Sequence, residues 1–233
     1  MLTTSEKYFS VIYGLIVIAE LISGSVEDLS TFNYICKPAI VISLLVFFIL
    51  KSKSLDKSYR LIVALALLFS LAGDSLLMFV DVSQNYFLLG LFAFLLAHVM
   101  YVIAFLKYRN KGQNPLGFIL FLMMYAAGLF YLLKDSLHDM LIPVTMYMLV
   151  ILSMSTAAYL QKGNISKLSY TLVFLGALLF MLSDSILALN KFYTPLPFSS
   201  IGIIVTYSLA QYFIIIGILK QKNASFFSSE NGL

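Results

Sequence analysis

Charge is what this sequence has least of. Only 11% of its 233 residues are Asp, Glu, Lys or Arg, whereas 61% are hydrophobic, and the mean hydropathy is +0.96. A soluble domain with this composition would have too little polar surface to face water. The composition therefore excludes an ordinary soluble protein and predicts a polytopic integral membrane protein.

Cysteine and histidine are nearly absent, which removes several chemistries. The single cysteine, Cys36, has no partner for an internal disulfide. Two histidines, His98 and His138, are too few for the usual ligands of a hydrolytic zinc site, so we expect no metal. The motifs of serine hydrolases, zinc proteases and phosphate-binding glycine loops are missing too. The net charge of +4 does not call for a nucleic-acid partner.

Long apolar runs fill most of the chain. Each is roughly as long as the ~20 residues that a helix needs to cross a bilayer, and lipid cannot satisfy open backbone groups, so helices are expected. We predict an all-α fold with one domain over residues 1–222 and a flexible tail over 223–233. The second span should begin at Lys37-Pro38, because proline suits a first helical turn. The eight predicted spans cover residues 8–23, 36–50, 60–80, 86–106, 116–133, 140–160, 168–189 and 198–219.

Lys and Arg are distributed unevenly between the two sets of loops and tails. One set holds Lys7, Lys51, Lys53, Lys57, Arg60, Lys107, Arg109, Lys111, Lys162, Lys167, Lys220 and Lys222, and the other holds only Lys37, Lys134 and Lys191. Positive residues favour the cytoplasmic side of a membrane. We therefore expect both termini to be cytoplasmic, and the short loops are typical of a bacterial inner-membrane protein.

Two stretches of the chain read as copies of each other. Residues 66–78 are ALLFSLAGDSLLM and residues 177–189 are ALLFMLSDSILAL, which places Asp74 and Asp184 at related positions inside apolar spans. A carboxylate near the middle of a membrane helix costs about 2.5–3.5 kcal/mol on insertion scales and is usually functional. Bonding to a serine or lysine on another helix is the structural alternative, but duplication favours a shared polar site.

The likeness continues into the following spans. Phe94 and His98 in the fourth span correspond to Tyr207 and Gln211 in the eighth. Spans four crossings apart run in the same direction, so we predict two parallel four-helix repeats, over about residues 8–106 and 116–219. Gly90, Phe94, His98, Tyr101 and Phe105 should share one helix face, which we expect to line an acyl-chain groove.

Two carboxyl groups in one apolar cavity suggest acid and base chemistry. Two nearby carboxyl groups in such a cavity do not both ionise easily, because their negative charges repel each other. One group can therefore hold a proton while the other is ionised. This arrangement suits hydrolysis through an oxocarbenium-like cation. Tyr101, Tyr207 and Gln211 also fit the simpler role of hydrogen bonding between helices.

The order of these features resembles that of the YhhN family of membrane proteins, which includes the TMEM86 lysoplasmalogenases. The matching features are Lys37-Pro38, Gly73-Asp74, Gly90, Phe94, Ala97-His98, Tyr101, Gly176-Ala177, Phe180, Ser183-Asp184, Tyr207 and Ala210-Gln211. The resemblance implies hydrolysis of the vinyl ether bond of lysoplasmalogens to a fatty aldehyde and glycerophosphoethanolamine or glycerophosphocholine, without a cofactor.

The resemblance also suggests roles for the polar residues. We expect one of Asp74 and Asp184 to protonate the alkene and the other to stabilise the cation and position water, without assigning which. His98, Tyr101 and Gln211 would orient water or the glycerol hydroxyl, and Lys37 or Lys191 would hold the phosphate. Further expected substrate contacts are Tyr207, Ser183 and Asn190.

Two other functions fit the sequence alone. A small transporter could use the same aspartates to carry protons or bind a cationic solute. A lipid-binding membrane protein without catalytic activity would need only the cavity. The oligomeric state, the head-group preference and the role of Glu20 are open at this point.

Overall fold

The structure is a computed structural model that describes residues 3–221, so the tail at 223–233 lies outside it. Within this range, eight helices are long and apolar enough to cross a membrane, which confirms the prediction of an all-α integral membrane protein. The fifth predicted span coincides with the observed helix at both ends. The eight helices are α1 (Thr4–Ser25), α2 (Ser30–Lys51), α3 (Lys57–Leu77), α4 (Gln84–Lys107), α5 (Leu116–Leu133), α6 (Leu141–Tyr159), α7 (Lys167–Phe192) and α8 (Ser199–Leu219).

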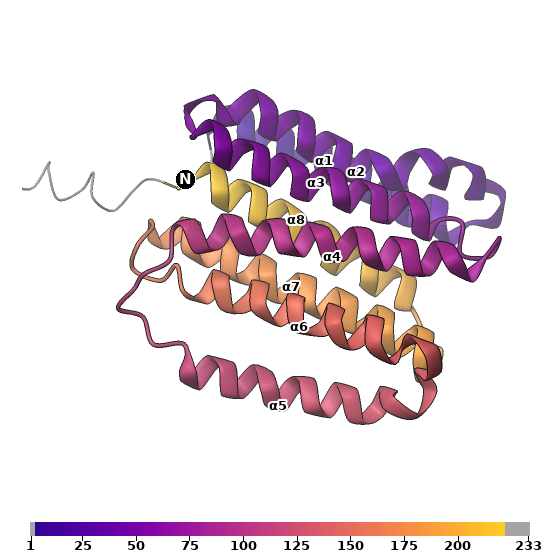
Figure 1. The fold of residues 1–233 in the computed structure, drawn as a ribbon. Helices are drawn as coiled ribbons and strands as arrows, with labels where there is room; N and C mark the ends of the chain where they lie inside the picture. Colours follow the sequence, from indigo (N-terminus) through magenta and orange to yellow (C-terminus); the bar gives the residue numbers. More distant parts are fainter. Residues whose placement is uncertain (1–2, 222–233) are drawn as a thin grey trace, which may run out of the picture.

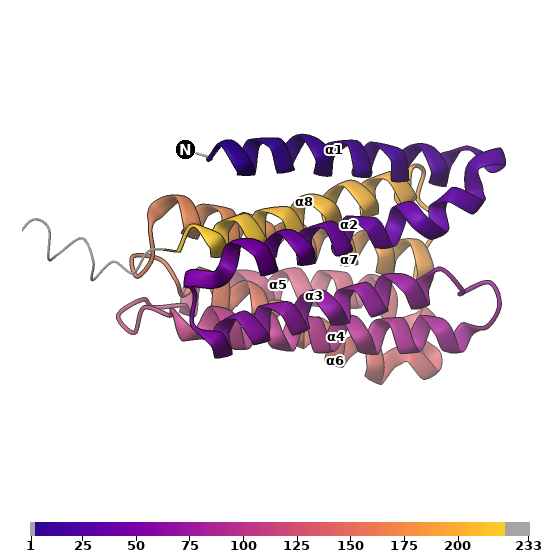
Figure 2. The ribbon, with the colours of Figure 1, turned by 90° about the horizontal axis from the view of Figure 1, so that it is seen from above.

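Successive helices run in opposite directions and form one elongated bundle (Figures 1 and 2). The N-terminal end of α1 therefore lies at the same end of the bundle as the C-terminal end of α8 (Figure 1). The most extensive contacts join α7 to α8 and α3 to α4, whereas α5 lies at the edge of the bundle. These are the helix pairs that the repeat prediction matches to each other, and the repeat itself stays a prediction.

The second helix is longer than the sequence suggested. It begins at Ser30, so Pro38 lies inside α2, and the prediction that the helix starts at Lys37-Pro38 was wrong. Polar residues such as Asn33 do not end the helix, because the Asn33 amide finds a partner on the neighbouring helix: it donates to Glu20 Oε1 of α1 at 3.1 Å. Lys37 consequently lies about two turns inside the helix rather than at its mouth.

Side-chain caps fix the beginnings of several helices. Thr3 forms a capping box with Glu6 on α1, and Ser83 and Ser166 cap α4 and α7. Asp56 caps α3 and also accepts a hydrogen bond from Lys107 at 2.7 Å, and this bond lowers the pKa of the Asp56 carboxyl. These caps satisfy backbone donors that a helix leaves open at its first turn.

Glycines allow the two main helix pairs to approach closely. A Cβ added to Gly176 of α7 would lie 2.9 Å from the Ala210 carbonyl oxygen and 3.0 Å from the Ile214 nitrogen of α8. A Cβ added to Gly73 of α3 would lie 2.5 Å from the Phe94 ring of α4. Since Gly73 directly precedes Asp74, this contact fixes where that carboxyl stands relative to α4.

Replacing Gly176 by alanine is expected to destabilise the fold by about 1–3 kcal/mol, because the new methyl group meets backbone atoms that cannot turn away. Gly128→Ala on α5 is the matched control, since a Cβ there meets nothing within 4 Å. It reports the gain in helix propensity alone, about 1 kcal/mol. Unfolding of both variants in detergent measures the difference, and equal stabilities would contradict the close contact.

Candidate functional site

A cavity of about 490 Å³ lies near the end of the bundle where α1, α3 and α7 finish and α2, α4 and α8 begin. Polar and charged side chains are concentrated in its wall. Most of the residues singled out from the sequence belong to this wall, namely Lys37, Asp74, Ser183, Asp184, Asn190, Lys191 and Tyr207, together with Glu20. His98, Tyr101 and Gln211 lie behind it, fully buried.

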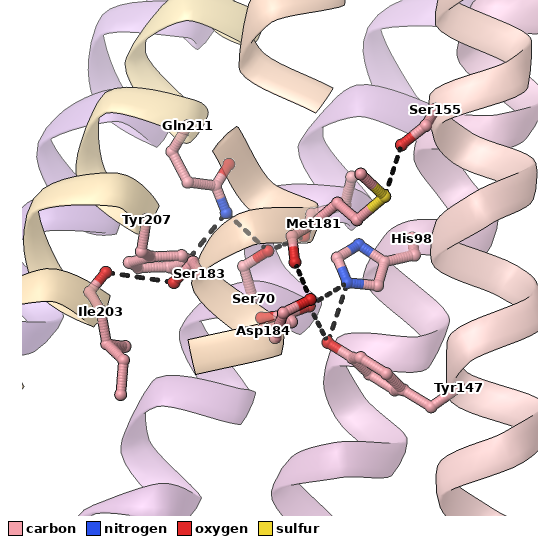
Figure 3. Close-up of polar contacts among 12 residues, drawn as sticks. Ser70, His98, Tyr147, Ser155, Met181, Ser183, Asp184, Ile203, Tyr207 and Gln211 are labelled. Carbon is pink, nitrogen blue, oxygen red and sulfur yellow. Dashed lines mark hydrogen bonds and ion pairs between the residues drawn. The ribbon is translucent and has the colours of Figure 1, made fainter. Parts of the chain in front are cut away.

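Asp184 joins the cavity to two buried partners. Its Oδ2 accepts a hydrogen bond from the Tyr147 hydroxyl at 2.5 Å and lies 3.1 Å from His98 Nε2 (Figure 3). His98 Nε2 is also 2.9 Å from the Tyr147 hydroxyl, so the three side chains form a closed triangle. Because they come from α7, α4 and α6, this triangle locks three helices around one carboxyl group. The Asp184 side chain is nevertheless 16% exposed, which keeps it within reach of a ligand.

Tyr147 was missed by the sequence reasoning. It is one of 15 tyrosines in the chain and stands in no motif. Its importance depends on the packing of α6 against α4 and α7, which brings its hydroxyl to Asp184. Nothing in the local sequence of α6 could have marked it.

Asp74 is held in a similar way by a different tyrosine. The Tyr207 hydroxyl of α8 donates to Asp74 Oδ2 at 2.6 Å, and Asp74 is 4% exposed. Behind Tyr207, the Gln211 amide nitrogen donates to Ser70 Oγ at 2.9 Å and lies 3.4 Å from the Tyr207 hydroxyl (Figure 3). Tyr101 completes this network by donating to Gln211 Oε1 at 2.6 Å. Gln211 thus contacts Tyr207 and Ser70, and Tyr101 contacts Gln211, behind the cavity wall.

The two carboxyl groups share the cavity without bonding to each other in the described part of the chain. Each is held at its Oδ2 by a tyrosine from another helix, Tyr207 for Asp74 and Tyr147 for Asp184. The structure thus has two separately supported carboxyl groups facing one space, because each aspartate packs against its own neighbouring helices.

Two narrow apolar cavities, about 40 Å³ each, also reach Asp184. One lies between α3, α4, α6 and α7, and the other lies between α5, α6 and α7. Asp184 lines both of them and the large cavity as well. It therefore stands at the boundary between a polar space and an apolar one. The other residues of the first are Leu77, Phe87, Leu91, Phe94, Val144, Tyr147, Leu187, Ala188 and Phe192, and those of the second include Tyr125, Leu129, Leu133 and Met148.

The apolar cavities do not follow the groove expected from the sequence. Phe94 lines two of the three cavities, but Tyr101 and Phe105 are completely buried in the core. The expectation of an acyl-chain groove along the whole aromatic face of α4 was therefore wrong. That face does exist, but most of it packs against other helices.

The three remaining residues predicted to contact substrate, Ser183, Asn190 and Lys191, lie in the last turns of α7 and also contact other parts of the protein. The Ser183 hydroxyl donates to the Ile203 carbonyl oxygen of α8 at 3.1 Å (Figure 3). Asn190 accepts a hydrogen bond from the Leu196 nitrogen at 2.9 Å, and Lys191 lies over the Phe87 ring at 5.4 Å.

Within residues 3–221, no three His, Cys, Asp or Glu side chains are grouped as metal ligands.

Comparison with known proteins connects this site to one family. A sequence profile of the YhhN family matches residues 32–218. Lysoplasmalogenase TMEM86B of Homo sapiens is 33% identical over 159 residues, which cover 67% of this chain and 62% of that protein. The match to lysoplasmalogenase TMEM86B of Sus scrofa is 33% identical over 189 residues, covering 80% of this chain and 74% of that protein. For lysoplasmalogenase TMEM86A of Bos taurus it is 33% over 162 residues, covering 67% of this chain and 64% of that protein.

The chain thus spans less than two thirds of the human TMEM86B protein that it matches. No solved structure matches it significantly. The family match includes both aspartates, both of their tyrosine partners and every residue of the cavity wall that follows α1, whereas the wall residues of α1, including Glu20, lie outside it. This chain belongs to the YhhN family.

Proposed function

We propose that this protein is a lysoplasmalogenase, which hydrolyses the vinyl ether bond of a lysoplasmalogen. The observation that carries the proposal is the position of Asp184 between the polar cavity and the two apolar ones. A lysoplasmalogen has the same order of parts: a charged glycerophospho head group, the vinyl ether, and an apolar alkenyl chain. With the head group in the large cavity and the chain toward the apolar ones, the vinyl ether lies beside Asp184.

The chemistry of a vinyl ether requires an acid first. Protonation of the alkene carbon next to the chain converts the ether into an oxocarbenium ion, and water then attacks the carbon bonded to oxygen. The resulting hemiacetal loses its hydroxyl proton while the glycerol oxygen gains one, so the carbon–oxygen bond breaks. One water is consumed, and the products are a fatty aldehyde and the glycerophospho head group. A carboxyl pair in a cavity of low polarity supplies both the proton and the opposing charge.

Asp184 is the residue that we assign as proton donor. The carbon to be protonated is on the chain side of the ether, and Asp184 is the aspartate that lines the apolar cavities. Tyr147 and His98 both contact its Oδ2. That arrangement directs the second oxygen, carrying the proton, to the substrate. Tyr147 and His98 act as positioning residues that hold the carboxyl group in place.

Asp74 then faces the developing cation from the polar side. Among the three cavities, it lines only the large one, where water and the head group have room. In its ionised form, the Asp74 carboxylate stabilises the oxocarbenium ion and accepts a proton from the attacking water. Tyr207, supported by Gln211, fixes its orientation. Lys37 and Lys191 line the same cavity from α2 and α7 and supply positive charge for the phosphate.

The proposal is tested by incubating the protein, purified in detergent, with 1-alkenyl lysophosphatidylethanolamine and measuring released fatty aldehyde. We expect aldehyde with and without EDTA, since no step above uses a metal. The 1-alkyl analogue, whose saturated ether cannot be protonated to an oxocarbenium ion, is the control and should yield none. If the folded protein releases no aldehyde from the alkenyl substrate, the proposal fails, and flux assays in proteoliposomes would examine the transport alternative.

A further inference from the structure

Glu20 of α1 is a buried carboxylate in the cavity wall that the reaction above does not use. It is 2% exposed and lines the large cavity. Its Oε1 accepts a hydrogen bond from the Asn33 amide of α2 at 3.1 Å. Its Oε2 is buried, and no donor reaches it within residues 3–221. A buried carboxylate oxygen without a donor is energetically costly, because it has lost its hydrogen bonds to water and accepts none from the protein.

The charges around Glu20 indicate what kind of donor would fit. Lys37 lines the same cavity, and its positive charge acts on both Glu20 and Asp74. The same cavity therefore presents a carboxylate from α1 and an ammonium group from α2. A zwitterionic phospholipid head group is complementary to it, with the phosphate toward Lys37 and the ammonium toward Glu20.

We propose that Glu20 binds the ammonium group of the lysolipid head group and favours the primary ammonium of ethanolamine. This inference rests on the function proposed above, and it names the head group. A primary ammonium has three N–H donors for the open Oε2. The trimethylammonium of choline has none and is usually held by aromatic rings.

The residues around Glu20 support the choice of ethanolamine over choline. The described residues of α1 and α2 that line this cavity include no aromatic ring, and the aromatic side chains in its wall, Phe87, Phe94 and Tyr207, come from α4 and α8. The lining residues of α1 and α2 are Glu20, Leu21, Gly24, Ser25, Asn33 and Lys37. The open Oε2 of Glu20 therefore lies on the side of the cavity formed by polar and aliphatic residues, where it is suited to a group that can donate hydrogen bonds.

The test uses the saturated 1-alkyl lysolipids, which the proposed reaction cannot cleave, as binding probes. Binding to the detergent-purified protein is measured by titration calorimetry for three head groups: phosphoethanolamine, phosphocholine and phosphate alone. Glu20→Gln is the main variant, since glutamine keeps an oxygen for Asn33 but removes the charge. Asp28→Asn is the control, because Asp28 is an exposed carboxylate near the same end of α1.

We expect wild type to bind the ethanolamine lipid most tightly. Glu20→Gln should weaken that binding about 10- to 100-fold, the usual worth of a hydrogen bond to a charged group, and leave the amine-free phosphate lipid unchanged. Asp28→Asn should change neither. Equal weakening for every head group would assign Glu20 a structural role and overturn the inference. Unaltered ethanolamine binding would overturn it as well.

Wild type alone provides a check that does not depend on any variant folding. If it binds the choline and ethanolamine lipids equally, the inference fails. The binding result is separate from catalysis, because these probes carry no vinyl ether. Aldehyde release without head-group discrimination would overturn only the role of Glu20. Discrimination without aldehyde release would overturn only the proposed reaction.

Discussion

Asp184→Asn is expected to lower kcat for aldehyde release by about 10²- to 10⁴-fold, the usual contribution of a general acid. An amide cannot deliver a proton to the alkene carbon. Asparagine still offers an oxygen to Tyr147 and His98, so the triangle that joins α4, α6 and α7 should persist. The measurement is the initial rate of aldehyde release at saturating 1-alkenyl lysophosphatidylethanolamine, together with thermal unfolding to show that the variant is folded.

The control for this variant is Asp135→Asn. The Asp135 side chain is 84% exposed and pairs with Lys134 in the segment between α5 and α6. The same change of charge at that position should leave kcat as it is. A folded Asp184→Asn protein with wild-type kcat would show that the proton comes from another group.

Asp74→Asn is expected to lower kcat by about 10²- to 10³-fold, as removal of a group that stabilises transition-state charge does. The reason differs from that for Asp184: the variant loses the negative charge that faces the cation, whereas the proton donor remains. Tyr207 can still donate to the amide oxygen, so the contact between α3 and α8 should be kept. The same rate assay measures the effect.

Binding of the uncleavable 1-alkyl lysolipid distinguishes this role from a structural one. Asp74→Asn should bind that lipid as wild type does, because the cation that Asp74 stabilises does not form in the bound ground state. A loss of binding equal to the loss of rate would place Asp74 in head-group recognition instead. An unchanged rate in the folded variant would exclude it from the reaction.

Most of the fold could be predicted from the sequence because the bilayer restricts the choices. Long apolar runs can only become membrane helices, so their number and approximate positions follow from composition. The start of α2 was predicted wrongly because the residues before Pro38 include polar ones. Those residues are tolerated where a neighbouring helix satisfies them, as Glu20 does for Asn33. Such a contact between helices cannot be read from one segment.

The same distinction applies to the site. Asp74 and Asp184 could be selected from the sequence because a carboxyl group in an apolar helix is costly and therefore conspicuous. The residues that surround these carboxyl groups could not be identified from the sequence in the same way. Tyr147 and Asn33 look ordinary in sequence, and they matter only because α6 and α2 bring them to Asp184 and Glu20. The three-dimensional packing also gives each carboxyl group a separate tyrosine partner.

The bond between Asp74 and Tyr207 sets an order for the assembly of the protein during synthesis. Tyr207 follows Asp74 by 133 residues, so at ~5–20 residues per second it is made about 7–27 s later. Throughout that interval α3 carries a carboxyl group whose partner does not yet exist, and the membrane opposes its insertion by about 2.5–3.5 kcal/mol. The contact between α3 and α8 is therefore among the last in the bundle to form, although α3 is made in the first half of synthesis.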